Sequence, residues 1–159
     1  MDVNIINPLL SAFSEIIPQI GFGTIEKKKI SVVGSNCSYN GVLINLAVIG
    51  SIKGVILIGM DLNSAKQFAS KMMMGMEVTD FDTLAQSAVS EMGNMVCANA
   101  CTHYSKIGIT GLDISPPTLM ITREGQEGQI TLPVPQTIVV HFLVDGIALQ
   151  VYAGLTNKA

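Results

Sequence analysis

Residues 81–105, FDTLAQSAVSEMGNMVCANACTHYS, decide the fold, because they predict one helix that is longer than any other element. Asp80 or Asp82 can cap its first turn, and Gly108 and Gly111 lie beyond its end. At a rise of about 1.5 Å per residue the helix measures roughly 37 Å, which makes it the predicted spine of the fold.

Two faces of this helix differ in character. One face is apolar and is predicted to pack on the core: Phe81, Leu84, Ala85, Ala88, Met92, Met95 and Val96. A second face holds mostly small residues: Thr83, Ser87, Ser90, Glu91, Asn94, Ala98, Cys101 and Ser105. An ordinary exposed helix face carries long charged side chains, often as pairs four residues apart. A face of small residues instead lets another backbone come close.

Glu91 and Asn94 are the only long polar side chains on that second face. Three residues apart on a helix, they share one side, with Cβ atoms roughly 5–6 Å apart. A pair of this kind is most often a solvated surface, and that interpretation stays open. Asn is a poor helix former, and Gly93 costs about 0.5–1 kcal/mol relative to Ala. Both residues therefore need a reason, which indicates that backbone or a partner crowds this side.

The first half of the chain predicts a helix, a strand and a hairpin. Pro18 and Gly21 end the helix, whose apolar residues recur at helical spacing: Leu9, Phe13, Ile16 and Ile17. Residues 30–36 are rich in β-branched side chains and predict a strand. Residues 42–48 and 55–60 predict two strands joined as a hairpin.

A second helix and further strands surround the long helix in sequence. Asp61 can cap a helix over residues 65–72, which closes in a methionine cluster at 72–76. Core packing is favoured for these methionines over an adaptable binding surface. The remaining predicted elements are short strands at 118–122 and 130–132 and a hairpin of 137–144 and 147–153 about Asp145-Gly146.

The two halves of the chain show weak internal sequence similarity. Residues 14–18, SEIIP, are similar to residues 90–94, SEMGN, and residues 54–58 are similar to residues 146–150. The predicted fold class is therefore α/β (α+β), a pseudo-two-fold repeat of helix plus β-hairpins, with a mostly antiparallel sheet packed against long helices. Residues 1–159 are expected to form a single domain. Pro18 stands where the second copy has Asn94, so the first copy would lack the acid–amide pair.

Composition excludes several classes of protein. Of 159 residues, 48% are hydrophobic and 13% charged, yet no apolar run approaches the roughly 20 residues of a membrane helix. The N-terminus lacks the basic start of a signal peptide, so a cytoplasmic location is expected. The net charge is −3, there is no Trp, and Lys27-Lys28-Lys29 is the one basic run, so nucleic acid is not an expected partner. The apolar excess favours an oligomer interface or a partner surface.

Cysteine and histidine residues predict no metal centre and no nucleophile. Cys37, Cys97 and Cys101 are an odd number and favour free, buried or half-buried thiols in a reducing compartment. Cys97, Cys101 and the nearby His103 would need further ligands to hold a metal, and no second cluster follows. His141 lies in an apolar strand and is expected in the core or on the sheet surface. No Ser-His-Asp candidate or P-loop is present.

A family resemblance rests on two segments. Residues 90–96, SEMGNMV, followed by Ala98-Asn99-Ala100, resemble the signature helix of the CheC/CheX/FliY chemotaxis phosphatases. Residues 112–118, LDISPPT, are similar to a segment common in CheX-like members. The likeness spans most of the chain, and a single motif copy with Pro18 at the other position is closer to CheX than to two-site CheC.

The resemblance implies a phosphatase that acts on the aspartyl phosphate of a CheY-like response regulator. The regulator would bring its own Mg²⁺, so this chain would need no cofactor. Asn94 would hold a water in line with the phosphorus, as a glutamine does in GTPases. Glu91 would pair with a lysine of the regulator, and Ser87, Ser90 and Ala98 would contact that partner. CheX-like proteins form dimers, and an edge strand offers one route to a homodimer.

Two other functions stay open at this point. A non-catalytic module could bind a regulator or a flagellar-switch component through the same helix face. A small-molecule sensor could use the apolar surplus to line a pocket. The sequence names neither the cognate regulator nor whether the circuit is chemotaxis or another two-component system.

Overall fold

The computed structural model describes residues 3–157. Within them lie three helices, α1 (Val3–Ile20), α2 (Leu62–Met72) and α3 (Thr83–Lys106). The strands of the described chain are β1 (Ile25–Val33), β2 (Asn36–Tyr39), β3 (Val42–Ile49), β4 (Lys53–Met60), β5 (Asp113–Ile114), β6 (Thr118–Ile121), β7 (Gly128–Thr131), β8 (Thr137–Val144) and β9 (Ile147–Thr156).

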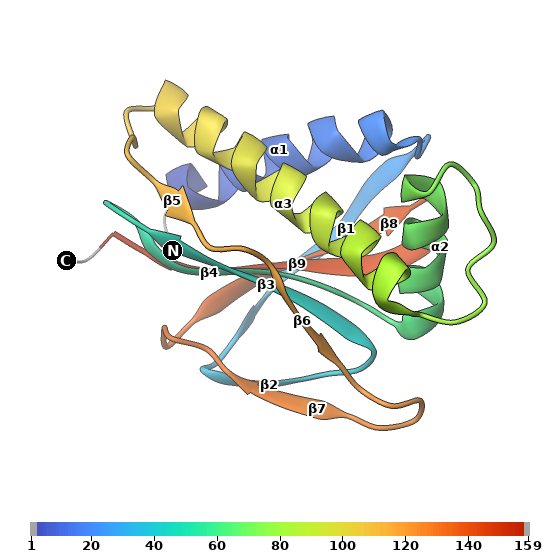
Figure 1. Cartoon of the computed structure of the whole chain (residues 1–159). Coiled ribbons are helices and arrows are strands. Elements are labelled where there is room, and N and C mark those ends of the chain that lie inside the picture. Colours follow the sequence, from blue (N-terminus) through green and yellow to red (C-terminus); the bar gives the residue numbers. More distant parts are fainter. Residues whose placement is uncertain (1–2, 158–159) are drawn as a thin grey trace.

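The main sheet separates a layer of helices from a small second sheet (Figure 1). Its strand order is β1-β8-β9-β4-β3-β5, with β6 also paired to β3, and every pair is antiparallel. Helices α1 and α3 pack against each other on one face, and the β2–β7 pair lies across the other face. The predicted fold class, long helices on a mostly antiparallel sheet, is therefore confirmed.

The topology agrees with the predicted two-fold repeat. Strands β4 and β9, the last strand of each half, pair at the centre of the sheet. The first strand of one half pairs with the hairpin of the other half: β1 lies on β8, and β5 and β6 lie on β3. Each half therefore completes the sheet of the other, which ties the two halves into one structure.

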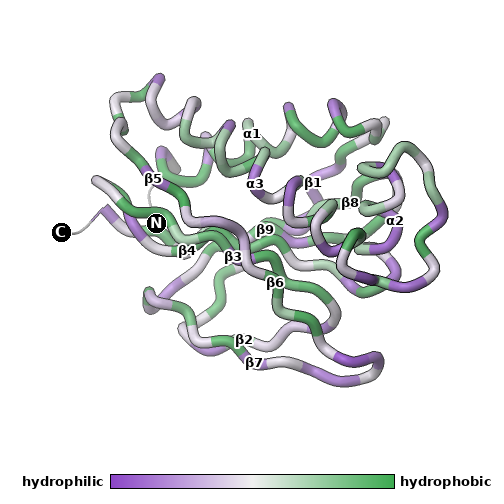
Figure 2. Tube along the Cα trace, in the orientation of Figure 1, coloured by the Kyte–Doolittle hydropathy of each residue, from purple (hydrophilic) through white to green (hydrophobic). Residues whose placement is uncertain are grey.

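Two hydrophobic clusters lie on the two faces of the sheet. The larger one fills the space between the helices and the sheet, and Ile44 and Leu46 of β3 belong to it. The smaller one, Leu43, Leu57, Leu132, Val139 and Tyr152, lies between the sheet and the β2–β7 pair. The central strands are largely hydrophobic, whereas the β6–β7 connection is hydrophilic (Figure 2). Because both faces of the central strands are covered, their side chains are apolar on both sides, which accounts for the high apolar content of the chain.

Local start and stop signals acted as predicted for α2, α3 and the hairpins. The Asp61 carboxylate accepts from the Ser64 amide at 2.7 Å, and Asp82 accepts from the Ala85 amide at 2.9 Å. Strands β8 and β9 form the second predicted hairpin. Its turn residues Asp145 and Gly146 have φ values of 49° and 80°, as a two-residue turn requires.

Of the two predicted stop signals of α1, Pro18 does not end the helix, which continues to Ile20. A proline lacks an amide donor and crowds the carbonyl four residues before it, but only two helical residues follow Pro18, and its own carbonyl still accepts from the Gly21 amide at 3.0 Å. Gly21, with φ of 122°, follows the last helical residue and ends the helix, as predicted. The helix also extends further toward the N-terminus than the predicted apolar repeat, which begins at Leu9, since α1 spans Val3–Ile20.

The predicted strand at residues 30–36 is also misplaced. Strand β1 begins at Ile25 and ends at Val33, and a separate strand β2 follows. The lysine run lies within β1 and is exposed, with a register shift between Lys27 and Lys29. Edge strands tolerate charges and bulges. Residues 25–29 therefore pair with β8 at the edge of the sheet although they lack the apolar pattern of a buried strand.

The prediction that the methionine cluster packs in the core is only partly confirmed. Met72 and Met73 pack against the main core, whereas Met74 and Met76 are 97% and 59% exposed. Met74 follows the end of α2 with a φ of 61°, and the chain turns away from the core there.

Candidate functional site

Helix α3 carries the candidate site, but its buried face differs from the predicted core stripe. Ala85, Met92 and Val96 are buried as expected, whereas Leu84 is 60% exposed. The complete buried set is Ala85, Val89, Met92, Gly93, Val96, Cys97, Ala100 and Tyr104. Small residues fill much of this face because the helix lies close to the sheet. The predicted core face was chosen by its large apolar residues, so it is rotated about the helix axis relative to the face that is buried.

Gly93 belongs to this close contact and not to a partner surface. A Cβ at Gly93 would lie 2.8 Å from Cγ2 of Ile44, a fully buried side chain of β3. The glycine therefore lets α3 approach β3, while Glu91 and Asn94 line the groove. The crowding inferred from the sequence is real, but a core side chain causes it.

An open groove of about 730 Å³ runs along the outer side of α3. One wall comes from the helix: Thr83, Gln86, Ser87, Ser90, Glu91 and Asn94. The other wall comes from the chain that links β5 to β6: Ile114, Ser115, Pro116, Pro117 and Leu119. That link passes beside α3 on the helix side of β3 (Figure 1). Two segments that are twenty or more residues apart in the sequence thus form one site.

Glu91 and Asn94 project into this groove without internal partners. Glu91 is exposed and Asn94 half-buried. Within residues 3–157 neither side chain forms a hydrogen bond or an ion pair. An acid and an amide held on a rigid helix, one turn apart and unpaired, can bind a cation and a water or hydroxyl of an incoming molecule.

The other predicted partner-binding residues separate into two groups. Ser87 and Ser90 line the groove beside the pair. Ala98 is exposed one turn beyond Asn94 and does not line the groove. Sequence reasoning placed Thr83 on the same helix face as Glu91 and Asn94 but did not place Gln86 or the two prolines at the site. The Ser-Pro-Pro motif was visible in the sequence, but only its pairing with β3 brings it opposite Glu91.

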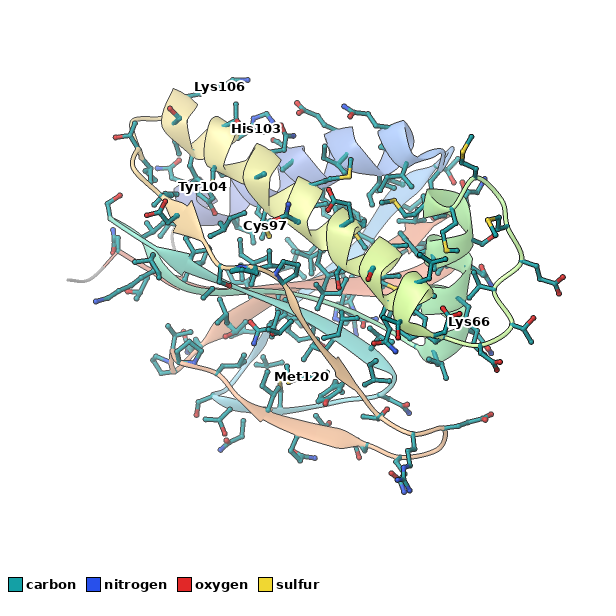
Figure 3. All side chains as sticks on the ribbon, in the orientation of Figure 1. Lys66, Cys97, His103, Tyr104, Lys106 and Met120 are labelled. Carbon is teal, nitrogen blue, oxygen red and sulfur yellow. The ribbon has the colours of Figure 1, made fainter. Side chains whose placement is uncertain are left out.

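The C-terminal part of α3 is bound to α1 by side-chain contacts. The Glu15 carboxylate accepts from Asn99 Nδ2 at 2.7 Å and lies 3.0 Å from Nε2 of His103. These two contacts lower the pKa of Glu15, the Asn99 hydrogen bond most. The buried Tyr104 hydroxyl donates to the Ile5 carbonyl. His103 and Tyr104 both lie toward the C-terminal end of α3 (Figure 3).

A similar groove in the first half of the chain lacks the acid–amide pair. It lies between α1 and β1, has a volume of about 730 Å³, and contains Ser14 and Pro18. Pro18 has no side-chain amide, and Glu15, at the position that matches Glu91, is engaged with Asn99 and His103. Among residues 3–157, the unpaired acid and amide one turn apart therefore lie on α3, and the matching positions of α1 lack them.

Thiols and histidines lie outside the groove. Cys97 is buried, and burial raises the pKa of its thiol to about 12. Cys37 and Cys101 are half-buried and unbridged, as expected. His141 lies half-buried on β8 with Nε2 3.1 Å from the Ser31 hydroxyl, so it is a sheet-surface residue as predicted. In the described part of the chain no three His, Cys, Asp or Glu side chains gather to hold a metal ion. None of the helices described here could span a membrane.

Solved structures share this fold. A CheC-like superfamily protein from Shewanella sp. PV-4 has a TM-score of 0.84 at 20% identity, over 98% of this chain and 99% of that one. A chain of the CheX–CheY–BeF₃–Mg²⁺ complex from Borrelia burgdorferi has a TM-score of 0.74 at 26% identity, over 95% and 97% of the two chains. The chain therefore has the fold of these CheC-like and CheX structures.

Sequence comparison narrows the class to one family. The model of the family described as chemotaxis phosphatase CheX matches residues 42–142, which include both walls of the groove. The CheY-P phosphatase CheX of Thermotoga maritima is 29% identical over 124 residues, which cover 78% of this chain and 79% of that protein. The chain belongs to the CheX family of chemotaxis phosphatases.

Proposed function

We propose that this protein hydrolyses the aspartyl phosphate of a CheY-like response regulator. The observation that carries the proposal is the unpaired pair of Glu91 and Asn94 on the rigid α3 wall of an open groove. The groove is open to solvent and has a volume of about 730 Å³. The relative from Thermotoga maritima is a CheY-P phosphatase, and the Borrelia burgdorferi relative was solved with CheY. Both support a regulator as the substrate.

Asn94 is assigned the water-positioning role. Its side-chain carbonyl can accept one hydrogen of a water and hold the oxygen in line with the phosphorus, as a glutamine does in GTPases. Half-burial limits the motion of the amide, and no internal hydrogen bond competes for it in the described chain. Positioning alone is a large effect, because a misplacement of about 1 Å can cost about 100-fold in rate.

Glu91 is assigned the docking role. Its exposed carboxylate lies one turn before Asn94 on the same helix face. An ion pair with a lysine beside the phosphate of the regulator would orient the partner and exclude other water. A carboxylate is a poor group to approach the anionic phosphoryl directly, so a cation of the partner is the better contact.

The groove holds hydroxyls but, among the described residues, no thiol and no histidine, and the proposed reaction needs no nucleophile from this chain. Its polar side chains are hydroxyls, amides and one carboxylate, and the least exposed thiol, Cys97, faces the core. The metal ion and the phosphorylated aspartate belong to the regulator, with Mg²⁺ as the expected metal. The chemistry supplied by this chain is the placement of one water and the exclusion of others.

Phosphate release from a phosphorylated single-domain regulator of the same organism tests the assignment. Asn94→Ala is expected to lower the rate at saturating regulator by about 100-fold. Glu91→Gln, which keeps the shape and removes the charge, is expected mainly to raise KM and to weaken the salt dependence of KM. Thr102→Ala, exposed on α3 away from the groove, is the matched control and should behave as the unaltered protein.

Two outcomes would contradict the proposal. Normal turnover by Asn94→Ala would remove that residue from the chemistry. Binding of the phosphorylated regulator with no change in its phosphate lifetime would support the non-catalytic interaction module instead.

A homodimer in the cytoplasm is the proposed working state. Strand β1 ends the sheet and presents Ile30 and Val32, which are 54% and 60% exposed. Unpaired edges with apolar side chains favour association with a second strand. Sedimentation should show a dimer at micromolar concentration, and Ile30→Lys should shift it to monomer. A monomer in both cases would contradict the proposal.

A further inference from the structure

The proline wall of the groove is built on a β-bulge. Strand β3 pairs with the opposite chain at Val48–Ile114 and again at Asn45–Thr118. Between these pairs β3 has two residues, Leu46 and Ala47, whereas the opposite chain has three: Ser115, Pro116 and Pro117. Three residues against two is the count that defines a bulge, and bulges commonly re-aim side chains beside functional sites.

Ser115 supplies the hydrogen bonds that hold this bulge. Its amide donates to the Ala47 carbonyl at 2.9 Å, and its hydroxyl accepts from the Ala47 amide at 2.8 Å. The same hydroxyl donates to the Pro116 carbonyl at 3.2 Å. Neither proline has an amide hydrogen, so neither can donate to β3. The Ser115 side chain therefore takes a place in the ladder that backbone atoms would otherwise fill.

Pro116 and Pro117 could have a purely structural role at the edge of the sheet. Prolines and bulges on an outer strand also prevent unwanted pairing with other sheets. That role explains why prolines occur here, but it would serve equally well with the rings turned to either side. In this structure both prolines line the groove opposite Glu91 and Asn94. Their fixed φ values also make the wall rigid before any partner arrives.

We propose that Ser115 is a positioning residue that holds Pro116 and Pro117 as a preformed seat for the regulator. The seat contacts the regulator surface next to its phosphorylated aspartate, while Glu91 and Asn94 contact it from α3. The inference rests on the proposed function for the identity of the partner. It adds a second, apolar contact surface to the polar one.

Binding and turnover of one regulator test the seat. The probe is a CheY-like regulator of the same organism, loaded with beryllium fluoride and Mg²⁺ for titration and phosphorylated for kinetics. Ser115→Ala is expected to raise both Kd and KM about tenfold, with kcat changed less than twofold. Ser115→Thr keeps the hydroxyl and is expected to restore both constants. This split and this rescue are not expected from a loss of stability alone.

The outcomes separate the two proposals. An unaltered Kd for Ser115→Ala, or an equal loss for Ser115→Thr, overturns the seat while leaving the proposed function intact. No phosphate release by the unaltered protein overturns the proposed function, whereas the Kd values still decide the seat. If Ser115→Ala lowers the unfolding midpoint, Pro116→Ala with Pro117→Ala replaces it. That variant keeps the serine bonds and must raise Kd, and a Kd equal to that of the unaltered protein overturns the seat.

Discussion

Replacing Gly93 by Ala tests how closely α3 must lie against the sheet. The new Cβ would lie 2.8 Å from Ile44 Cγ2, whereas non-bonded carbons rest about 3.5 Å apart or more. The contact is therefore short by about 0.7 Å (3.5 − 2.8). Ile44 Cγ2 is attached directly to the branched Cβ and lies in the fully buried core, so it cannot simply swing away.

Two opposing terms set the size of the effect. Overpacking a filled core costs about 1–3 kcal/mol. Exchanging Gly for Ala within a helix gains about 1 kcal/mol. The free energy of unfolding should therefore fall by about 0–2 kcal/mol, and each kcal/mol lowers Tm by roughly 2–4 °C in a chain of this length. A retreat of α3 also moves the adjacent Asn94, so turnover should fall more than stability suggests.

Urea unfolding with a double-mutant cycle checks this reasoning. In the Ile44→Ala background the clashing methyl is gone, so Gly93→Ala should stabilise by about 1 kcal/mol instead of destabilising. Thr102→Ala, at an exposed site of the same helix, controls for propensity and should be neutral or slightly stabilising. If Gly93→Ala raises stability by about 1 kcal/mol in the unaltered background as well, the close-approach argument is refuted.

Three further predictions concern groups outside the groove. Tyr104→Phe removes a buried hydroxyl that donates to an α1 carbonyl, and should lower the free energy of unfolding by about 1 kcal/mol in urea titrations. Thr137→Val should instead raise Tm, because the buried Thr137 hydroxyl has no hydrogen-bond partner in the described chain; a lower Tm would contradict this. The backbone amides of Gly23 and then Thr24 lower the pKa of Asp145 below its ordinary 3.8. Its stabilising contribution is therefore present above about pH 4 and is lost as the pH falls through the folded-state pKa, so Asp145→Asn should flatten the acid limb of a stability–pH curve.

Some elements were predictable because their signals are local. Asp82 caps α3 through an amide three residues away. Asp145-Gly146 is a common two-residue turn pair that adopts positive φ values, although the Asp145 carboxylate also accepts from the distant Gly23 and Thr24 amides. The two hairpins, β3–β4 and β8–β9, follow from runs of strand-forming residues separated by turn residues. The shared helix face of Glu91 and Asn94 follows from their spacing of three residues. Helix and strand periodicity operate within a few residues, so the sequence contains all that they need.

Other elements depend on contacts that the local pattern does not contain. Strand β1 pairs with β8, more than a hundred residues away, and its exposed lysines do not predict a strand. The short distance between α3 and β3 decides which side of α3 is buried. The small residues Gly93 and Ala100 face the sheet, and the larger Leu84 is exposed. Pairing and close approach are settled only when distant segments meet.

The sequence by itself determined one wall of the site, since Glu91 and Asn94 share a face of any helix that contains them. The tertiary structure alone decided the other wall. Ser115, Pro116 and Pro117 reach the groove because β3 accepts β5 and β6 on either side of a bulge. The physical reason is that a helix face repeats within four residues, whereas a groove needs two surfaces whose separation is fixed by pairing across the sheet.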